Sequence, residues 1–473
     1  MSIGLPREKE CVPDDIPPLL AKQILRALSK NNARMLEGLS ITDNQRAVVK
    51  RARELLSLAS RPHVCDFKYV QTKSSPTKGP LRILYVAHTS LIEHKNGYSV
   101  RTHEIVKSLA RAGHNVRVVL RPTPEPGYDE ELDGVEYGRH NLAIDVCGNW
   151  ESYQNHYSKI IEKEAFDFKP DLIHAASNHI TGYAAARAAN SLNIPIIYEV
   201  RGFWEVTRLA NHPKYEMSAG YEAQVNLESY IIRSVDHVLT LNGAMVDEVV
   251  RRGASRENVS LLPNCGDPNL FSTVTSSKPI SEGPITFGYV GSFVQYEGLT
   301  LLIKAFLELC KKGENVRLYL AGHGSIEPLL RRAAKGPHEG MVHFHGAFSR
   351  EGLEAIYNQI DVVVLPRRPN QVTRLVSALK PLEAFSAGLP AIFSDVRPLA
   401  ELAEDSRGAI CFEAGQIKDL TAKMRELIDD PDLRKQLGKN ARNFIETDRN
   451  WDSHISRLIQ TYHTVLRIND PAD

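Results

Sequence analysis

Most of the chain after residue 80 alternates short apolar runs with longer stretches whose apolar residues recur at helical spacing. The run LRILYVAH (81–88) is typical of a buried strand, and GYSVRTHEIVKSLARAG (97–113) is typical of a helix that ends at a glycine. Further strand-like runs follow: HNVRVVL, DLIHAA, PIIYEV, DHVLTL and NVSLLP. Strands that alternate with helices in this way predict a parallel sheet joined by right-handed crossovers.

A second series of the same kind begins near residue 284, with the strand-like runs ITFGYVG, VRLYLAG, MVHFHG, DVVVLP, PAIFSD and GAICFE. The two series are separated by a stretch rich in proline, glycine, serine and asparagine, LPNCGDPNLFSTVTSSKPISEGP. We therefore predict an α/β fold with two Rossmann-like, doubly wound domains, at residues 80–275 and 276–448. Ligands of such sheets bind outside the carboxyl ends of the strands, so we expect a site in a cleft that both domains face.

Residues 1–79 lack this alternation. Helical spacing at 16–28 and 44–59, followed by the linker-like QTKSSPTKGP, predicts a helical N-terminal extension. The second of these helices is basic, which fits a solvated face but also a membrane surface, a partner or a contact between copies of the chain. The sequence leaves these roles open.

The composition of the 473 residues is that of a soluble globular protein, with 42% hydrophobic and 24% charged residues. A formal net charge of +1 argues against a nucleic-acid-binding protein, which needs a strong basic excess. The six cysteines are widely spaced, which argues against a metal or redox motif. No apolar run reaches the roughly 18 residues of a membrane span. We expect a cytoplasmic protein, with contact to the inner face of a membrane left open.

The stretch LVSALKPLEAFSAGLPAIFSD (375–395) predicts a short helix with a proline just inside its start and a glycine past its end. Free N–H groups and a positive dipole end favour anions at a helix start, and Lys380 adds a charge suited to phosphate. Glu383, one turn further on, would accept a hydrogen bond from a ribose hydroxyl. The alternative is that Glu383 only complements the helix dipole and that Lys380 is solvated.

A glycine-punctuated turn, GYVGSFVQYEG (288–298), joins a strand to a helix at the start of the second series. Its Gly291 and Ser292 can bring backbone N–H groups close to a phosphate. An ordinary turn between a strand and a helix is the alternative.

Positive charge is concentrated in LPRRPNQVTRLV (365–376), which leaves another strand of the second series. Arg367, Arg368 and Arg374 lie close in sequence to Lys380, so together they predict a local site for an anion. A solvated cluster of charges is the alternative.

In the first series, a long loop and helix start, HTSLIEHKNGYSVRTHE (88–104), follows the first strand. A loop of this length in a compact domain more often has a function than not. We expect it to place His88 and Arg101 near the edge of the sheet. A structural role is the alternative for any single histidine.

The segment YEVRGFWE (198–205) continues directly from a strand of the first series. Arg201, Trp204 and Glu205 would lie at the carboxyl end of that strand. An arginine, an aromatic residue and an acid at this edge suit a polar, ring-shaped ligand, whereas packing under a loop would also explain Trp204.

Taken together, these motifs resemble the retaining glycosyltransferases of family 4 with the GT-B architecture, over residues 81–466. The resemblance rests on the ordered succession of segments rather than on any one of them. In the first domain and the linker the segments are NGYSVRTHEIVKSLARAGHNVRVV, PDLIHAAS, IPIIYEVRGFW and LLPNCGDPNLF. In the second domain they are PITFGYVGSF, LYLAGHG, VHFHG, DVVVLP and PLEAFSAGLPAIFSD. RNWDSHISRLIQTYHTVL is similar to the family's terminal helix, so residues 449–473 are expected to cross back to the first domain.

The resemblance implies transfer of a sugar from a nucleotide diphosphate sugar, with retention of the anomeric configuration and without a metal or other cofactor. The donor would lie on the second domain, where Glu383 matches the glutamate that holds the ribose. Gly97 matches the first-loop glycine that faces the diphosphate. Backbone donors near Val376 and Ser377 would stabilise the leaving group.

The chain departs from the common family pattern at three donor-site positions. Leu375 stands where many members carry a sugar-binding glutamate, and Ser292 and Glu297 stand where many carry an arginine and a lysine. The forms GSFVQYEGL and LVSALKPLEA are similar to a subgroup associated with bacterial exopolysaccharide assembly.

We therefore expect Lys380, Arg367 and Arg374 to supply the missing positive charge. Arg201 occupies a position at which many members have a histidine. The catalytic candidates are Arg201, Lys380 and Arg367, and the candidates for the acceptor side are His88, Arg101, Trp204 and Glu205.

The sequence thus predicts a retaining glycosyltransferase that moves a hexose-type sugar from a UDP- or GDP-sugar to a glycan, lipid-linked or small-molecule acceptor in bacterial polysaccharide or glycoconjugate synthesis. Two alternatives remain: a nucleotide-sugar-binding scaffold that has lost the chemistry, and a nucleotide-sugar epimerase or phosphorylase on the same architecture.

Overall fold

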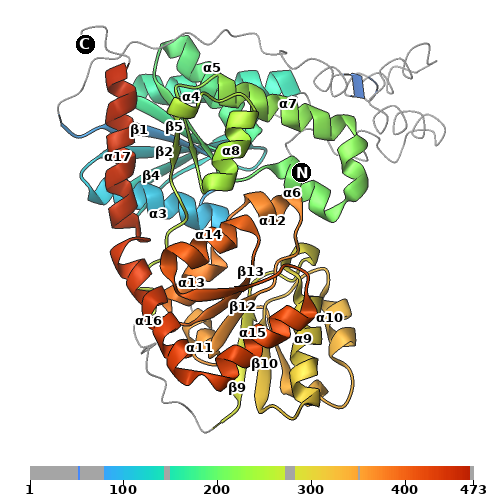
Figure 1. Ribbon diagram of the computed structural model, residues 1–473. Helices are drawn as coiled ribbons and strands as arrows, with labels where there is room; N and C mark the ends of the chain where they lie inside the picture. Colours follow the sequence, from blue (N-terminus) through green and yellow to red (C-terminus); the bar gives the residue numbers. More distant parts are fainter. Residues whose placement is uncertain are drawn as a thin grey trace. The chain divides into compact units, whose positions relative to one another are not determined.

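The computed structural model describes residues 49, 52–53, 79–142, 150–271, 283–349 and 352–468, so nearly all of the predicted N-terminal extension lies outside the described residues. The chain divides into two compact units, each with its own sheet (Figure 1). The first unit comprises Met1–Leu241, Met245–Leu262 and Ile455–Asp473, and the second comprises Asn242–Ala244 and Pro263–His454. Each unit is described by itself.

The described part of the first unit contains an eight-stranded sheet in the order β3-β4-β2-β1-β5-β6-β7-β8. Its neighbouring strands pair in parallel, except that β3 and β4 are antiparallel. The order reverses between β1 and β5, which are hydrogen-bonded neighbours, so a topological switch point lies there. The strands are β1 (Arg82–Ala87), β2 (Asn115–Thr123), β3 (Tyr128–Leu132), β4 (Val135–Asn141), β5 (Leu172–Ala176), β6 (Ile196–Val200), β7 (His237–Thr240) and β8 (Val259–Leu261).

Helices connect these strands because their apolar residues recur at helical spacing and cover the sheet. In α3, for example, Ile105, Val106 and Leu109 are buried, and Asn96 caps the helix start by accepting from the backbone N–H groups of Tyr98 and Ser99. The helices are α3 (Gly97–Arg111), α4 (Trp150–Phe168), α5 (His179–Leu192), α6 (Trp204–Asn211), α7 (Ala219–Arg233) and α8 (Gly243–Arg251).

The second unit has a six-stranded parallel sheet in the order β11-β10-β9-β12-β13-β14. Numbered from its first strand this order is 3-2-1-4-5-6, the doubly wound arrangement whose switch point lies between the first and fourth strands. Here these strands are β9 and β12. The strands are β9 (Ile285–Val290), β10 (Val316–Ala321), β11 (Val342–Gly346), β12 (Val362–Leu365), β13 (Ala391–Ser394) and β14 (Ala409–Phe412).

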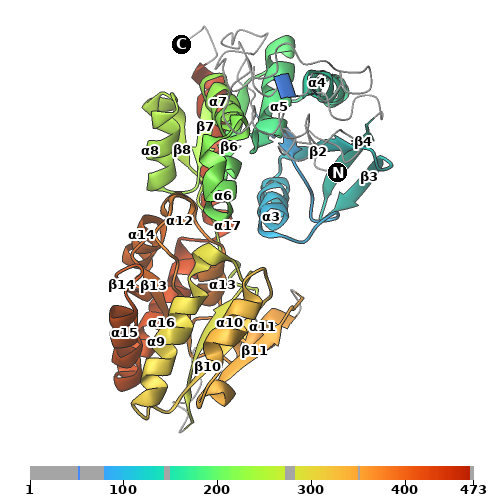
Figure 2. The same cartoon turned by 90° about the vertical axis from the view of Figure 1, so that its right-hand side faces the viewer.

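The core of the second unit lies between this sheet and its helices, and its large buried residues include Phe287, Phe306 and Phe393. Helices α9 and α15 lie side by side along this unit (Figures 1 and 2). The helices are α9 (Leu299–Lys311), α10 (Glu327–Ala334), α11 (Leu353–Tyr357), α12 (Gln371–Leu375), α13 (Lys380–Ser386), α14 (Arg397–Ser406), α15 (Ile417–Asp429) and α16 (Pro431–Thr447).

The last helix, α17 (Trp451–Ile468, red in Figure 1), begins in the second unit and runs into the first from Ile455 onward. The hydroxyl of Tyr462 on this helix lies 2.6 Å from His174 Nδ1 on β5. This buried polar contact joins the later part of α17 to the sheet of the first unit.

The change from the first unit to the second occurs between Leu262 and Pro263, earlier than the predicted boundary at residue 275. The reason is that the following segment packs on the second unit: Phe271 belongs to its core, and Arg442 donates a hydrogen bond to the Pro268 carbonyl oxygen. Among the described residues, no helix has both the length and the apolar character that crossing a membrane requires.

Candidate functional site

The candidate donor site in the second unit is built at the carboxyl end of β9, where Gly291 has a φ of +141°. A Cβ atom at this position would lie 2.1 Å from Cε of Lys380, so only glycine allows the lysine side chain to lie against this turn. The proximity of Gly291 and Lys380 agrees with the prediction that both belong to one site.

Glu297, in the same loop, lies at the centre of a buried ion cluster. Its Oε1 is 2.9 Å from Lys380 Nζ and 3.0 Å from Arg367 Nη2, and the side chain is only 1% exposed. Burial alone would raise the pKa of Glu297, but the charges of Arg367 and Lys380 lower it to about 2. Glu297 is therefore ionised at neutral pH and acts on the two cations.

Lys380 and Arg367 differ in how much of their charge remains accessible. Arg367 is buried, and its Nη1 donates to the carbonyl oxygen of Val376 at 2.9 Å. The Lys380 side chain is 20% exposed, and Nζ lies 5.3 Å from the ring centre of Tyr289. Burial and, to a lesser degree, the charge of Arg367 lower the pKa of Lys380, although Glu297 opposes this shift. Lys380 is thus the cation of this cluster that can meet a ligand.

Glu383 lies in the first turn of α13, three residues after Lys380, so both project from neighbouring positions on the helix surface. The hydroxyl of Tyr357 donates to Glu383 Oε2 at 3.3 Å, and Glu383 is half-buried. Its assignment to a ribose hydroxyl stays a prediction.

The residues around α12 fit the predicted site unevenly. Arg374 is exposed on this helix, and Ser292 is exposed in the loop after β9. We predicted backbone donors near Val376 and Ser377. The Val376 N–H donates to the Val372 carbonyl oxygen and closes the helix, so it is not free for a phosphate, whereas a donor near Ser377 stays a prediction. The Ser377 hydroxyl and the Leu375 carbonyl oxygen both accept from Asn242, which fixes this segment.

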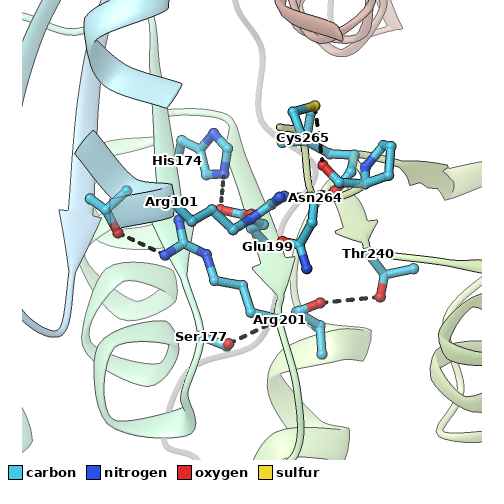
Figure 3. A network of polar contacts seen from close by, with 12 residues as sticks. Arg101, His174, Ser177, Glu199, Arg201, Thr240, Asn264 and Cys265 are labelled. Atoms are coloured by element: carbon cyan, nitrogen blue, oxygen red, sulfur yellow. Dashed lines mark hydrogen bonds and ion pairs between the residues drawn. The ribbon is translucent and has the colours of Figure 1, made fainter. Parts of the chain in front are cut away.

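In the first unit, the two predicted arginines meet on a glutamate that the predictions did not include, Glu199 at the end of β6 (Figure 3). Arg101 Nε donates to Oε1 and Arg201 Nη2 to Oε2, each at 2.7 Å. The glutamate is fully buried, with Tyr85 donating to Oε2 at 2.8 Å and His174 Nε2 at 3.4 Å. Burial would raise the pKa of Glu199, but Arg201 and Arg101 hold it well below its usual range.

Arg201 makes further contacts within the unit through Nη1, while its buried Nε has no hydrogen-bond partner among the described residues. Nη1 donates to the Thr102 hydroxyl and to the Tyr98 carbonyl oxygen, and the guanidinium lies 4.5 Å over the Tyr98 ring. These contacts give Arg201 and Arg101 the geometry of positioning residues, and a catalytic role for Arg201 stays a prediction. The loop residue Gly97, at the start of α3, is exposed.

Glu205, a predicted acceptor-side residue, points into the unit. It is 1% exposed and lies 2.7 Å from Arg252 Nη2, and Arg252 also stacks 3.8 Å over the Phe203 ring. These contacts anchor the first turn of α6, so Glu205 positions Trp204 rather than presenting its carboxylate to a ligand.

Trp204 and His88 are the predicted acceptor-side residues that are not fully buried. Trp204 is 42% exposed, His88 is half-buried, and their rings lie 5.0 Å apart at 84°. The sequence reasoning missed His179, whose ring also lies close to Trp204, at 6.2 Å. It also missed Glu199, although a single acid in the apolar run PIIYEV was a usable signal.

Two family models match the chain. The model described as "Glycosyl transferase 4-like domain" matches residues 96–265, and the model described as "Glycosyl transferases group 1" matches residues 273–444. Together they span both units.

Characterised relatives share low sequence identity with this chain, but the similarity extends over most of its length. A glycogen synthase of Mycobacterium tuberculosis is 23% identical over 398 residues, which are 78% of this chain and 92% of that protein. A sulfoquinovosyl transferase of Arabidopsis thaliana is 25% identical over 401 residues, which are 80% of this chain and 72% of that protein.

Solved structures share the fold. A sucrose-phosphate synthase from Thermosynechococcus elongatus superposes with a TM-score of 0.65 at 18% identity, covering 82% of this chain and all of that one. The Anabaena protein HepE in complex with UDP-glucose gives a TM-score of 0.61 at 14% identity, with 81% of this chain and all of that chain covered. With the two parallel sheets and the matched family models, these findings show that the chain belongs to the GT-B glycosyltransferases of group 1, family 4.

Proposed function

We propose that this glycosyltransferase moves a hexose-type sugar from a UDP- or GDP-sugar to a glycan, lipid-linked or small-molecule acceptor, with retention of the anomeric configuration and without a metal ion. We further propose that it serves bacterial polysaccharide or glycoconjugate synthesis. The observation that carries the proposal is the position of Lys380, whose partly exposed side chain lies against Gly291 and whose amine is held by Glu297.

The place of this lysine in the sheet supports donor binding. Gly291 follows β9, and Arg367 follows β12 after one intervening residue, so the cluster lies at the switch point of the second unit. In doubly wound sheets this is where nucleotides bind. The absence of the usual loop cations at Ser292 and Glu297 is balanced by a lysine that approaches from α13.

The proposed chemistry places Lys380 beside the departing diphosphate. As the bond to the sugar breaks, negative charge grows on the phosphate oxygens, and a fixed ammonium stabilises that charge more in the transition state than in the substrate. Glu383 would hold the ribose hydroxyls beside it. The leaving diphosphate oxygen would accept the proton of the acceptor hydroxyl on the same face of the sugar, so no enzyme nucleophile enters the scheme.

The test begins with thermal-shift measurements on UDP, GDP, ADP and dTDP and their sugars, because the correct nucleotide stabilises the folded state by mass action. Transfer is then assayed with the stabilising donor, with and without EDTA, and the anomeric configuration of the product is read by NMR. We expect a product with the donor's configuration, formed equally with EDTA.

Three results would count against parts of this proposal. Binding without turnover for any acceptor would favour the scaffold, and a changed sugar without an acceptor would favour an epimerase. An inverted product would exclude the retaining mechanism while leaving the glycosyltransferase assignment intact.

A further inference from the structure

The carboxyl ends of three neighbouring strands of the first unit carry a cluster of aromatic and imidazole rings. His88 follows β1, His179 begins α5 three residues after the end of β5, and Trp204 begins α6 after β6. Trp204 lies at an edge-on angle to both histidines, at 5.0 Å from His88 and 6.2 Å from His179. Trp150 extends the cluster, 5.7 Å from His179. This cluster lies at the switch point between β1 and β5, where a doubly wound sheet binds ligands.

Polar atoms in this cluster lack hydrogen-bond partners among the described residues. They are His88 Nδ1, Asn178 Nδ2 and His179 Nε2, and all three are buried. A buried polar atom without a partner destabilises the fold, so such atoms rarely gather without a ligand or water to meet them. Since His88 is half-buried and Trp204 is 42% exposed, a ligand reaches this cluster across these two side chains.

The rings of the cluster are polar but uncharged. Burial lowers the pKa of both His88 and His179, to about 3 for His179, so both rings are uncharged at neutral pH. Glu228 Oε2 lies 3.9 Å from His179 Nδ1, and burial raises the pKa of this carboxyl group to about 8, so it is mostly neutral as well. The adjacent Arg201 shares the carboxylate of Glu199 with Arg101, and Glu205 pairs with Arg252. Arg121 of β2 acts on His88 through its charge and is half-buried. The surroundings of Trp204 therefore offer hydrogen bonds and an aromatic surface more than they offer charge.

We propose that Trp204, His88 and His179 form an acceptor subsite that takes a neutral sugar ring, so that the acceptor is a saccharide or glycoside bound through its sugar. This inference rests on the proposed function, because it names the acceptor class for that reaction. The faces of a pyranose ring carry C–H groups that pack on an aromatic ring, and Trp204 supplies such a surface. A neutral imidazole has one donor and one acceptor nitrogen, which matches a hydroxyl that also donates and accepts.

The scaffold around the subsite fixes its members. The Tyr98 hydroxyl accepts from the His88 backbone N–H at 2.9 Å, and the Tyr98 ring lies under the Arg201 guanidinium. The contact of Glu205 with Arg252 holds the first turn of α6, which carries Trp204. The buried arginines and Glu205 thus act on the acceptor through the position of His88 and Trp204.

The test uses saturation-transfer NMR on the full chain, with its donor site filled by the nucleoside diphosphate that gives the largest thermal shift. The probes are methyl glucoside, galactoside, mannoside and N-acetylglucosaminide, a methyl glucuronoside and octyl phosphate. We expect ring protons of at least one neutral glycoside to receive saturation. Trp204→Ala should weaken its binding about tenfold, the change that loss of one stacking contact of roughly 1.4 kcal/mol produces. His88→Ala should weaken it as well, and Trp204→Phe should weaken it less than Trp204→Ala.

The matched control is Phe166→Ala, because Phe166 is a 75% exposed aromatic residue of the same unit. It lies near the end of α4, which leads into the amino end of β5, at the opposite edge of the sheet. This variant should bind the glycoside as the unchanged chain does.

The proposal is overturned if no neutral glycoside binds, if only the glucuronoside or octyl phosphate binds, or if Trp204→Ala binds as tightly as the unchanged chain. The nucleoside diphosphate is titrated into every variant to show that it is folded. A chain that binds nucleotide but none of these sugars contradicts the acceptor inference alone, whereas a chain that binds no nucleotide contradicts the proposed function.

Discussion

Each unit holds a buried glutamate between two cations near the carboxyl edge of its sheet. In the first unit Glu199 lies between Arg101 and Arg201, and in the second Glu297 lies between Arg367 and Lys380. In both cases burial would raise the pKa of the glutamate, and the neighbouring cations lower it. The difference lies in the second cation, which is a buried arginine with several hydrogen-bond partners in one unit and a lysine in the other.

An arginine has five N–H donors in a fixed fork, so it can satisfy several partners and become part of the framework. Arg201 does this through Glu199, Tyr85 and Thr102. A lysine has a compact ammonium on a flexible stem, and the Lys380 side chain remains 20% exposed while its amine pairs with Glu297. From this comparison we propose that similar charge clusters serve structure in the first unit and ligand binding in the second.

The largest expected effect is the loss of stability on Glu199→Ala. The variant leaves two buried guanidinium groups without their carboxylate, which costs roughly 3–5 kcal/mol of unfolding free energy. Urea denaturation measures this loss, with Glu131→Ala on the exposed face of β3 as the control. A loss below about 1 kcal/mol would mean that the cluster is not part of the framework.

Next is the loss of transfer on Lys380→Ala. Removing one fixed group that stabilises the leaving diphosphate should lower the turnover number by roughly 10²–10³-fold. The thermal midpoint should change little, since Arg367 still pairs with Glu297. Lys304→Ala, at an exposed lysine on α9, is the matched control for turnover. Equal turnover in both variants would contradict the functional role of the second cluster.

Glu297→Gln separates the positioning of Lys380 from its charge. Lys380 is charged below its pKa and neutral above it, so transfer should fall as the pH rises through that value. The Glu297 carboxylate raises the pKa of Lys380 against burial and Arg367. Its removal should therefore move the alkaline limb of the turnover profile to lower pH. An alkaline limb that stays in place would show that Glu297 does not act on Lys380.

The smallest expected effect is that of Tyr462→Phe in the first unit. This change removes the hydroxyl that contacts His174 across 288 residues of sequence. A net hydrogen bond contributes roughly 0.5–1.5 kcal/mol, so stability should fall by about that amount. Calorimetry measures the change, and nucleotide affinity should stay as it was. An altered nucleotide affinity would contradict this expectation and show that the Tyr462 hydroxyl affects donor binding.

The sequence predicted the doubly wound sheets well, because strand and helix periodicities follow directly from the alternation of buried and exposed faces. That Lys380 and Gly291 belong to one donor site stays a prediction, and the structure adds that the Lys380 side chain lies against Gly291. The boundary at residue 275 was placed too late, because composition does not reveal that Phe271 packs into the second core.

The same pattern could not tell which cations are buried. Arg367 and Lys380 lie in similar sequence contexts and both pair with Glu297. They differ in side-chain exposure, which is 8% for Arg367 and 20% for Lys380 and which depends on the folded structure. The pairing of His174 with Tyr462 depends on where α17 lies, which no local pattern encodes. Glu199 could have been noted, since an acid inside an apolar strand requires buried partners.

The most direct test of the difference between the two clusters compares nucleoside diphosphate and monophosphate affinities, by calorimetry, for the unchanged chain and Lys380→Ala. The base is the one that gives the largest thermal shift. If Lys380 meets the diphosphate, the variant should lose roughly ten- to a hundredfold in diphosphate affinity, as expected for a charged hydrogen bond, and much less for the monophosphate. Equal losses for both nucleotides, or no loss for either, would contradict the assignment of Lys380 as the diphosphate ligand.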